Sequence, residues 1–165
     1  MASGNTLLIF PAIAGEPPPT AFAQVDTRGA DSHPILDFDD TTQEAIYFTG
    51  ILPRHYAGGG ITVYLHWMAT TAVSGTGGWD VAFERMSDGA TDLDAASYAT
   101  AQTVTAATVP AAAGIIAVTN VAVSNGANMD NIAAGEAFRL RVRRDVANDT
   151  AVGDLELVAV ELKET

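Results

Sequence analysis

Residues 52–86 read LPRHYAGGGITVYLHWMATTAVSGTGGWDVAFERM, and this stretch decides the fold class. One face of its first half carries Ile61, Val63, Leu65, Trp67 and Ala69, and the other carries Thr62, Tyr64, His66, Met68 and Thr70. This alternation has the period of a β-strand with one buried face, whereas on a helix Val63 and Trp67 would point away from the apolar stripe. The glycines of residues 71–78 favour a chain reversal, and the alternation then resumes at Trp79. The stretch therefore predicts a central hairpin in an all-β domain.

The composition limits the partners of this chain. Its 165 residues include no cysteine, 8 basic residues and 20 acidic residues, which give a formal net charge of −12. That charge repels nucleic-acid phosphates and anionic membrane surfaces. No apolar run approaches the ~20 residues of a membrane-spanning helix. We therefore expect no disulfide, no nucleic-acid partner and no membrane partner.

Short strand patterns separated by turn residues fill the rest of the chain. They lie at residues 34–38, 44–49, 102–106, 115–123, 137–144 and 154–163, and residues 95–102 form a short helix candidate. This arrangement predicts an all-β, two-sheet antiparallel sandwich of the jelly-roll type, with about eight to ten strands. We assign residues 33–165 to that domain and the proline-rich residues 1–32 to an extended N-terminal arm with one or two edge strands. The arm either contacts a neighbouring molecule or lies along its own sandwich.

The last strand departs from simple alternation. Leu155 and Leu157 lie on one face of the strand, but Val158, Val160 and Leu162 fall on the opposite face. Either a bulge switches the register or another subunit covers the second face. Of these two interpretations the sequence slightly favours the subunit.

Residues that carry chemistry form no recognisable catalytic or metal pattern. His33, His55 and His66 are too scattered to supply the three or four ligands of a zinc site, and no thiol or Gly-x-Ser-x-Gly motif is present. The acidic loops at residues 37–40 and 88–94 offer oxygen ligands for calcium, but turn stabilisation is the favoured interpretation. Carboxylate pairs for glycoside hydrolysis stay open, because pairing distances are invisible in a sequence. We therefore expect no enzyme, no cofactor and no metal.

Half of the chain's cationic residues lie in one strand. Arg139, Arg141 and Arg143 alternate outward with Phe138, Leu140 and Val142 facing inward, and Arg144 follows them. These arginines either pair with acids on neighbouring strands or meet an acidic patch on another subunit. The sequence leaves both possibilities open.

Three runs resemble a β-sandwich module found in structural proteins of tailed bacteriophages. They are residues 52–86, AGEAFRLRVRRD at residues 134–145 and GDLELVAVELKE at residues 153–164. The resemblance covers about residues 48–165, although the arm and residues 95–135 match poorly. The positions that define the shared pattern are Pro53, Tyr56, Gly58, Gly59, Gly60, Trp67, Trp79, Gly135, Phe138, Arg144 and Asp145.

The resemblance implies a bacteriophage virion protein that decorates the capsid. As a cement protein it would bind the major capsid protein on the outside of the coat shell, stabilise the shell and associate as a homotrimer, and it would have no catalytic residues. The candidate subunit or shell contacts are Phe10, Pro11, Arg54, His55, Tyr56, Tyr64, His66, Arg139, Arg141, Arg143, Val158 and Val160. The alternative is a glycan-binding or receptor-binding head-fibre or tail module, which needs an exposed aromatic side chain such as Tyr56, Tyr64 or Trp79.

Overall fold

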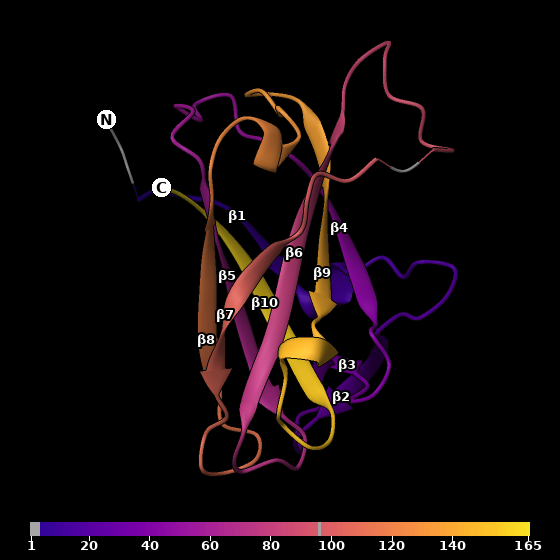
Figure 1. The fold of residues 1–165 in the computed structure, drawn as a ribbon, viewed down its shortest axis with the longest axis vertical. Coiled ribbons are helices and arrows are strands. Elements are labelled where there is room, and N and C mark those ends of the chain that lie inside the picture. Colours follow the sequence, from indigo (N-terminus) through magenta and orange to yellow (C-terminus); the bar gives the residue numbers. More distant parts are fainter. Residues whose placement is uncertain (1–3, 96) are drawn as a thin grey trace.

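Two antiparallel β-sheets packed face to face make up the computed structural model, which describes residues 4–95 and 97–165 (Figure 1). The predicted all-β, two-sheet sandwich is confirmed. The ten strands are β1 (Thr6–Pro11), β2 (Gln24–Arg28), β3 (His33–Phe38), β4 (Ala45–Ile51), β5 (Ile61–Ala69), β6 (Thr76–Met86), β7 (Gln102–Thr108), β8 (Ala117–Val123), β9 (Ala137–Arg144) and β10 (Leu155–Glu164). Three short 3₁₀ turns join them: η1 (Ala12–Ala14), η2 (Ala127–Met129) and η3 (Val146–Asn148).

The strands divide unequally between the sheets. Sheet A has the order β2-β3-β10-β5-β8, and β1 also pairs with β10. The first half of β10 pairs with β3, and its second half pairs with β1 on the same side. Sheet B has the order β4-β9-β6-β7. None of the helical turns in the described ranges has the length and apolar character of a membrane-spanning helix.

The predicted central hairpin is wrong, although both of its strands exist. β5 pairs with β10 and β8 in sheet A, whereas β6 pairs with β9 and β7 in sheet B. The glycine-rich residues between them therefore carry the chain from sheet A to sheet B at one end of the sandwich (Figure 1). Because the buried faces of the two strands point toward each other, Trp67 and Trp79 meet inside, with ring centroids 6.1 Å apart.

The core is filled by large apolar side chains from both sheets. Trp67, Trp79, Phe38 and Phe83 are fully buried. The edge of Phe38 packs on Trp79 with ring centroids 5.0 Å apart. Gly77 makes room for this packing, because a Cβ atom there would lie 2.6 Å from the ring of Trp67. The two tryptophans and that glycine thus fix the spacing of the sheets at one end of the sandwich.

A β-bulge at Val158 explains the mixed pattern of the last strand. The pairing of β10 with β5 shifts register between Leu157 and Ala159. As a result Leu155 and Leu157 before the bulge, and Val160 and Leu162 after it, all face the core and are fully buried. The slight preference for a covering subunit is therefore corrected, because one extra residue switches the side of every later side chain.

The N-terminal segment is part of the sandwich, and its Leu7 and Phe10 are buried in the core. β1 pairs with β10 and β2 pairs with β3, so the described part of the arm lies along its own sandwich as part of sheet A. The domain boundary predicted at residue 32 falls in the turn between β2 and β3. The predicted helix at residues 95–102 is wrong for the described residues, which are irregular up to β7. Residue 96 of that segment lies outside the described residues.

Arg144 is buried, which corrects its grouping with the outward-facing arginines. It ends β9 in phase with Phe138, Leu140 and Val142, so its side chain enters the sandwich. Its Nε donates to Asp149 Oδ2 at 2.8 Å, and its terminal nitrogens donate to the carbonyl oxygens of Phe38, Gly153 and Ala151 at 3.0, 2.9 and 3.2 Å. The guanidinium therefore ties the end of β3 to the loop that leads into β10.

Replacing Arg144 by methionine should lower the free energy of unfolding by about 3–5 kcal/mol, because Asp149 and three carbonyls lose their donor in a buried place. Arg144→Lys should recover little of the lost stability, because an ammonium group cannot reproduce the planar set of donors of a guanidinium. Urea denaturation measures both. Arg85→Met, which breaks the more exposed Arg85–Glu136 pair, is the control and should cost about 1 kcal/mol or less. Equal losses for Arg144→Met and Arg85→Met would contradict this role.

Candidate functional site

The outer face of sheet B carries a group of charged and aromatic side chains. β9 contributes Arg139, Arg141 and Arg143, which confirms their predicted outward direction. β6 contributes Asp80, Ala82 and Glu84, and β4 contributes Tyr47. These side chains share one face because residues two apart on a strand point to the same side. We call this set, together with Tyr98, the sheet B face.

Cross-strand register arranges this face in rows. Arg143 lies opposite Asp80 and forks onto its carboxylate, with the closest N–O distance at 2.7 Å. Arg139 lies opposite Glu84, with its nitrogen 3.7 Å from Oε2. Pairing with acids on a neighbouring strand, one of the two possibilities left open by the sequence, therefore accounts for two of the arginines.

Tyr98 covers the middle of the sheet B face. It lies in the irregular segment between β6 and β7, where the Ala99 amide donates to the Phe83 carbonyl at 2.8 Å. Its ring stacks on Tyr47, with centroids 5.6 Å apart and planes 29° apart. Arg139 lies 4.4 Å above the Tyr47 ring, and Arg141 lies 5.1 Å from the centroid of Tyr98. Two tyrosines and two guanidinium groups thus form one stacked layer.

Several polar atoms of this layer have no hydrogen-bond partner among the described residues. They are the Tyr98 hydroxyl, Glu84 Oε2 and Arg141 Nε, all shielded from solvent. Burial raises the pKa of the Tyr98 hydroxyl above its usual value, so this group stays a donor at neutral pH. Buried polar atoms without partners are uncommon in folded proteins. Their concentration beside two aromatic rings distinguishes the sheet B face from the rest of the surface.

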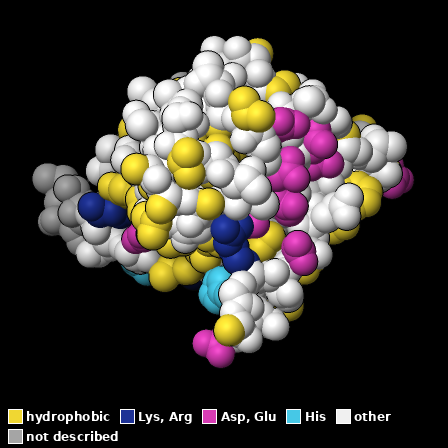
Figure 2. Space-filling view, turned by 90° about the horizontal axis from the view of Figure 1, so that it is seen from below, with side chains coloured by type: hydrophobic (Ala, Val, Ile, Leu, Met, Phe, Trp, Pro, Cys, Tyr) yellow, Lys and Arg dark blue, Asp and Glu magenta, His cyan; other side chains and the backbone are white. Residues whose placement is uncertain are grey.

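The outer face of sheet A is more apolar. Two adjoining hollows of about 330 and 210 Å³ share Ile9, Val158 and Ala159. Ile9 is 65% exposed and Val118 is 51% exposed. Tyr64 lies on the same sheet, with the Lys163 ammonium 5.9 Å from its ring centroid. Viewed from the lower end of Figure 1, hydrophobic side chains gather on one side and acidic side chains on another (Figure 2).

The structure separates the residues that the sequence proposed as contacts. Phe10, Tyr56, Val160 and Trp79 are buried, so they are corrected from surface candidates to core residues. Tyr56 is held inside because its hydroxyl accepts the Gly60 amide at 2.9 Å. The other candidates divide into Arg139, Arg141 and Arg143 on the sheet B face, Pro11, Tyr64, His66 and Val158 on or beside the outer side of sheet A, and Arg54 and His55 exposed in the β4–β5 loop.

Sequence reasoning missed Tyr47 and Tyr98. Tyr47 stands between the core residues Ile46 and Phe48, so alternation alone was enough to place it outward. Tyr98 gave no comparable signal, because the irregular segment that contains it has no periodicity. Its contact with Tyr47, 51 residues earlier in the chain, depends on how that segment crosses the sheet.

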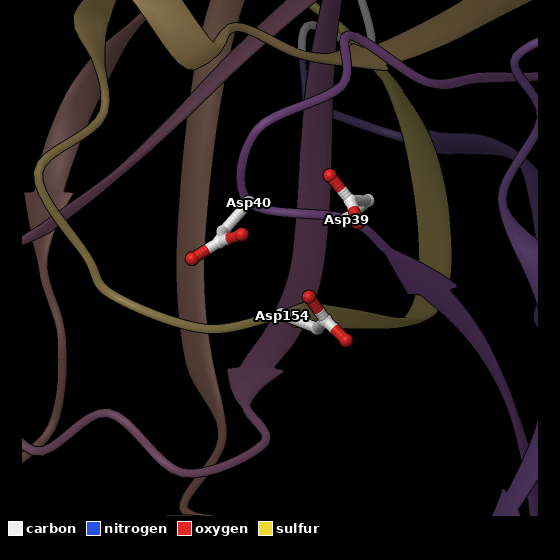
Figure 3. A group of neighbouring side chains, drawn as sticks. All are labelled: Asp39, Asp40 and Asp154. Atoms are coloured by element: carbon white, nitrogen blue, oxygen red, sulfur yellow. The ribbon is translucent and has the colours of Figure 1, made fainter.

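A group of acids lies at the lower end of the sandwich. Asp39 and Asp40 come from the turn after β3, and Asp154 comes from the segment that leads into β10 (Figure 3). One carboxylate oxygen of each lies within 4.8 Å of the others, and such oxygens suit a hard cation. However, Asp39 Oδ1 already accepts hydrogen bonds from both Thr41 and Thr42, and Asp40 Oδ2 accepts the Gly153 amide. The favoured interpretation of residues 37–40 as turn chemistry agrees with these bonds.

The pKa values of these acids differ with their surroundings. Hydrogen bonds from Thr41 and Thr42 lower the pKa of Asp39 to about 2. Partial burial raises the pKa of Asp154, and nearby carboxylates raise it further. Asp37 is the next-to-last residue of β3, and its pKa is raised to about 6 by burial and by the nearby carboxylates of Asp154 and Glu156. Asp37 and Glu156 face each other across the strand pair, so like charges meet there.

Comparison with known proteins places the fold in a wider group. No family model matches the chain, and no curated protein sequence matches it. Among solved structures, it is similar to the CBM22-2 xylan-binding domain of Xyn10C from Paenibacillus barcinonensis, with a TM-score of 0.53 and 12% identity over 92% of each chain. It is also similar to CBM35 of Abf62 from Cellvibrio japonicus, with a TM-score of 0.51 and 10% identity over 94% of this chain and 91% of that one.

These likenesses show a shared β-sandwich fold. Identities of 12% and 10% are too low to transfer a ligand or a set of binding residues. None of the comparisons tests the resemblance to phage structural proteins. The capsid partner, the homotrimer and the virion location therefore stay predictions.

Asp37→Asn should stabilise the protein above pH 6. The folded carboxyl group binds its proton more tightly than the unfolded one, so its favourable contribution is present at low pH and is lost between about pH 3.8 and 6. We expect a gain of about 1 kcal/mol at pH 7.5, discounted for solvent screening, or roughly 2–4 °C in melting temperature, and little difference at pH 3.5. Thermal melts across pH measure this. Asp31→Asn, an exposed site with the same charge change, is the control, and an equal gain there would contradict the assignment.

Proposed function

We propose that this chain is a non-catalytic module that binds carbohydrate on the sheet B face. The observation that carries the proposal is the stacked layer of Tyr47 and Tyr98 bordered by arginine and acid side chains. A sugar ring presents C–H groups that pack on aromatic rings and hydroxyl groups that bond to guanidinium and carboxylate groups. Aromatic side chains with a few placed polar groups are the usual composition of a small-ligand site.

The fold supports this proposal at a coarser level. Two solved structures that share it are carbohydrate-binding modules, one of them described as xylan-binding. A rigid sheet is also a suitable support, because side chains on paired strands keep fixed spacings. The choice of face in this chain rests on its own side chains.

The carboxylates of the sheet B face do not suit hydrolysis, because both are buried and bonded within the protein. Asp80 is held by Arg143, and Glu84 accepts the Ser97 amide at 2.6 Å. Asp80 and Glu84 are four positions apart along an extended strand, a distance of about 13 Å. Glycosidases need two carboxyl groups at roughly 5–9.5 Å. The pair is therefore too widely spaced and too firmly bonded for that chemistry.

A virion surface protein is the second candidate function. The observation that favours it is the apolar outer face of sheet A, where Ile9 and Val118 are exposed beside the hollows lined by Val158. Exposed apolar patches often mark protein-binding surfaces. In this candidate, that face binds the major capsid protein or another copy of the chain in a homotrimer. Light scattering and co-sedimentation with coat shells test it, and a monomer that stays in the supernatant would count against it.

Tyr47→Ala should weaken carbohydrate binding about tenfold, because the layer loses one of its two rings. A glycan array with the unaltered chain selects the ligand, and titration calorimetry then compares variants. Tyr64→Ala, which removes a tyrosine from the opposite sheet, is the matched control and should retain affinity. Loss of affinity in Tyr64→Ala alone would move the site to sheet A, and no binding to any glycan would refute the proposal.

A further inference from the structure

The sheet B face has one more arginine than it has partners. Along β9 the outward residues are Arg139, Arg141 and Arg143, and along β6 the residues opposite them are Glu84, Ala82 and Asp80. Two rows thus pair an arginine with a carboxylate. In the middle row a methyl group stands where the other rows have an acid.

Arg141 therefore lacks an acidic partner on either side. Its neighbour in the row on β4 is Tyr47, and its neighbour on β6 is Ala82. Within the ranges 4–95 and 97–165, no carboxylate oxygen lies within 4.0 Å of its guanidinium, and its Nε has no hydrogen-bond partner. Glu16, beside β4, instead accepts a hydrogen bond from Thr49, in the row of Arg139. Among the outward arginines of β9, Arg139 and Arg143 have an acid of the described residues within 4.0 Å and Arg141 does not.

Aromatic rings line the approach to this arginine. Arg141 lies against Tyr98, whose ring stacks on Tyr47. The Tyr98 hydroxyl, a second donor without a partner, belongs to the same layer. Arg141 is half-buried, although its Nε is shielded from solvent. A guanidinium fork next to a ring surface fits a molecule that combines an anionic group with an apolar ring face.

From this arrangement we infer that the module recognises a saccharide with an anionic substituent, which Arg141 binds while Tyr47 and Tyr98 pack on the sugar ring. The inference rests on the proposed carbohydrate-binding function and names the ligand class. The anionic group of the ligand would pair with Arg141 as Glu84 and Asp80 pair with the other two arginines, since Ala82 opposite Arg141 carries no charge. Carboxylate, as in a uronic acid, and sulfate share the required chemistry. The charge of −12 disfavours long polyanions at a distance, so short oligosaccharides are the suitable probes.

The test compares each acidic sugar with its uncharged counterpart. Trisaccharides of galacturonate, glucuronate and mannuronate are titrated beside their methyl esters, which keep the ring and lose the charge. A sulfated and an unsulfated galactose disaccharide form the second arm, and neutral xylotriose is included. We expect a charged sugar to bind roughly ten- to a hundredfold more tightly than its neutral partner. The arm that binds distinguishes carboxylate from sulfate.

Variants assign the preference to Arg141. Arg141→Gln should bring the ratio of the affinities for the charged sugar and its neutral partner close to one, while Arg141→Lys should keep part of that ratio. Arg54→Gln, an exposed arginine in the β4–β5 loop with the same charge change, is the control and should behave like the unaltered chain. Circular dichroism melts verify that each variant is folded.

Two different failures are separable. Equal affinity for charged and neutral sugars would overturn this inference and leave carbohydrate binding in place. Loss of the charge preference in both Arg141→Gln and Arg54→Gln would also overturn it, because the effect would come from net charge alone. If the unaltered chain binds none of these saccharides and no glycan on the array, the proposed function fails together with the inference.

Discussion

The buried guanidinium of Arg144 is the interaction on which the lower end of the sandwich depends. A cation in the interior is tolerated only when its donors are matched, and here one carboxylate and three carbonyl groups match it. Those acceptors come from the end of β3 and from the loop that precedes β10, which are far apart in the chain. The side chain therefore holds together the two elements that bring Asp39, Asp40 and Asp154 into one group.

Opposite-sheet packing of β5 and β6 sets the rest of the architecture. Because the chain passes from sheet A to sheet B between these strands, each strand has its apolar face toward the other and its polar face outward. β9 then completes sheet B beside β6, and β10 completes sheet A beside β5. The bulge at Val158 keeps the long β10 buried on one side over its whole length, so sheet A closes on the core without a second covering layer.

The same register that builds sheet B also builds its candidate binding face. In two rows an arginine of β9 meets an acid of β6. In the third row, Tyr47 of β4 stands beside Arg141, and Tyr98, from the segment between β6 and β7, stacks on Tyr47. Ion pairs at the ends of the face hold the long side chains in place. The centre, where Arg141 lies against the ring of Tyr98, is the place where a ligand can add a charge-assisted bond that the protein itself does not make.

Local alternation is enough to predict most of the strands and the faces that they bury. Only an extended strand puts every second side chain on the same side, so the alternation at residues 61–69 and 137–144 predicts both the strands and their buried faces. It places Leu65, Trp67, Phe138 and Leu140 in the core and Arg139, Arg141 and Arg143 outside. Strand pairing depends on tertiary contacts, because a hairpin and a connection between two sheets have the same alternation. The alternation already puts Arg144 in phase with Phe138, Leu140 and Val142, but tertiary contacts decide that Val158 bulges and that Tyr98 lies over Tyr47. Each of these depends on contacts between residues distant in the chain, which local pattern does not encode.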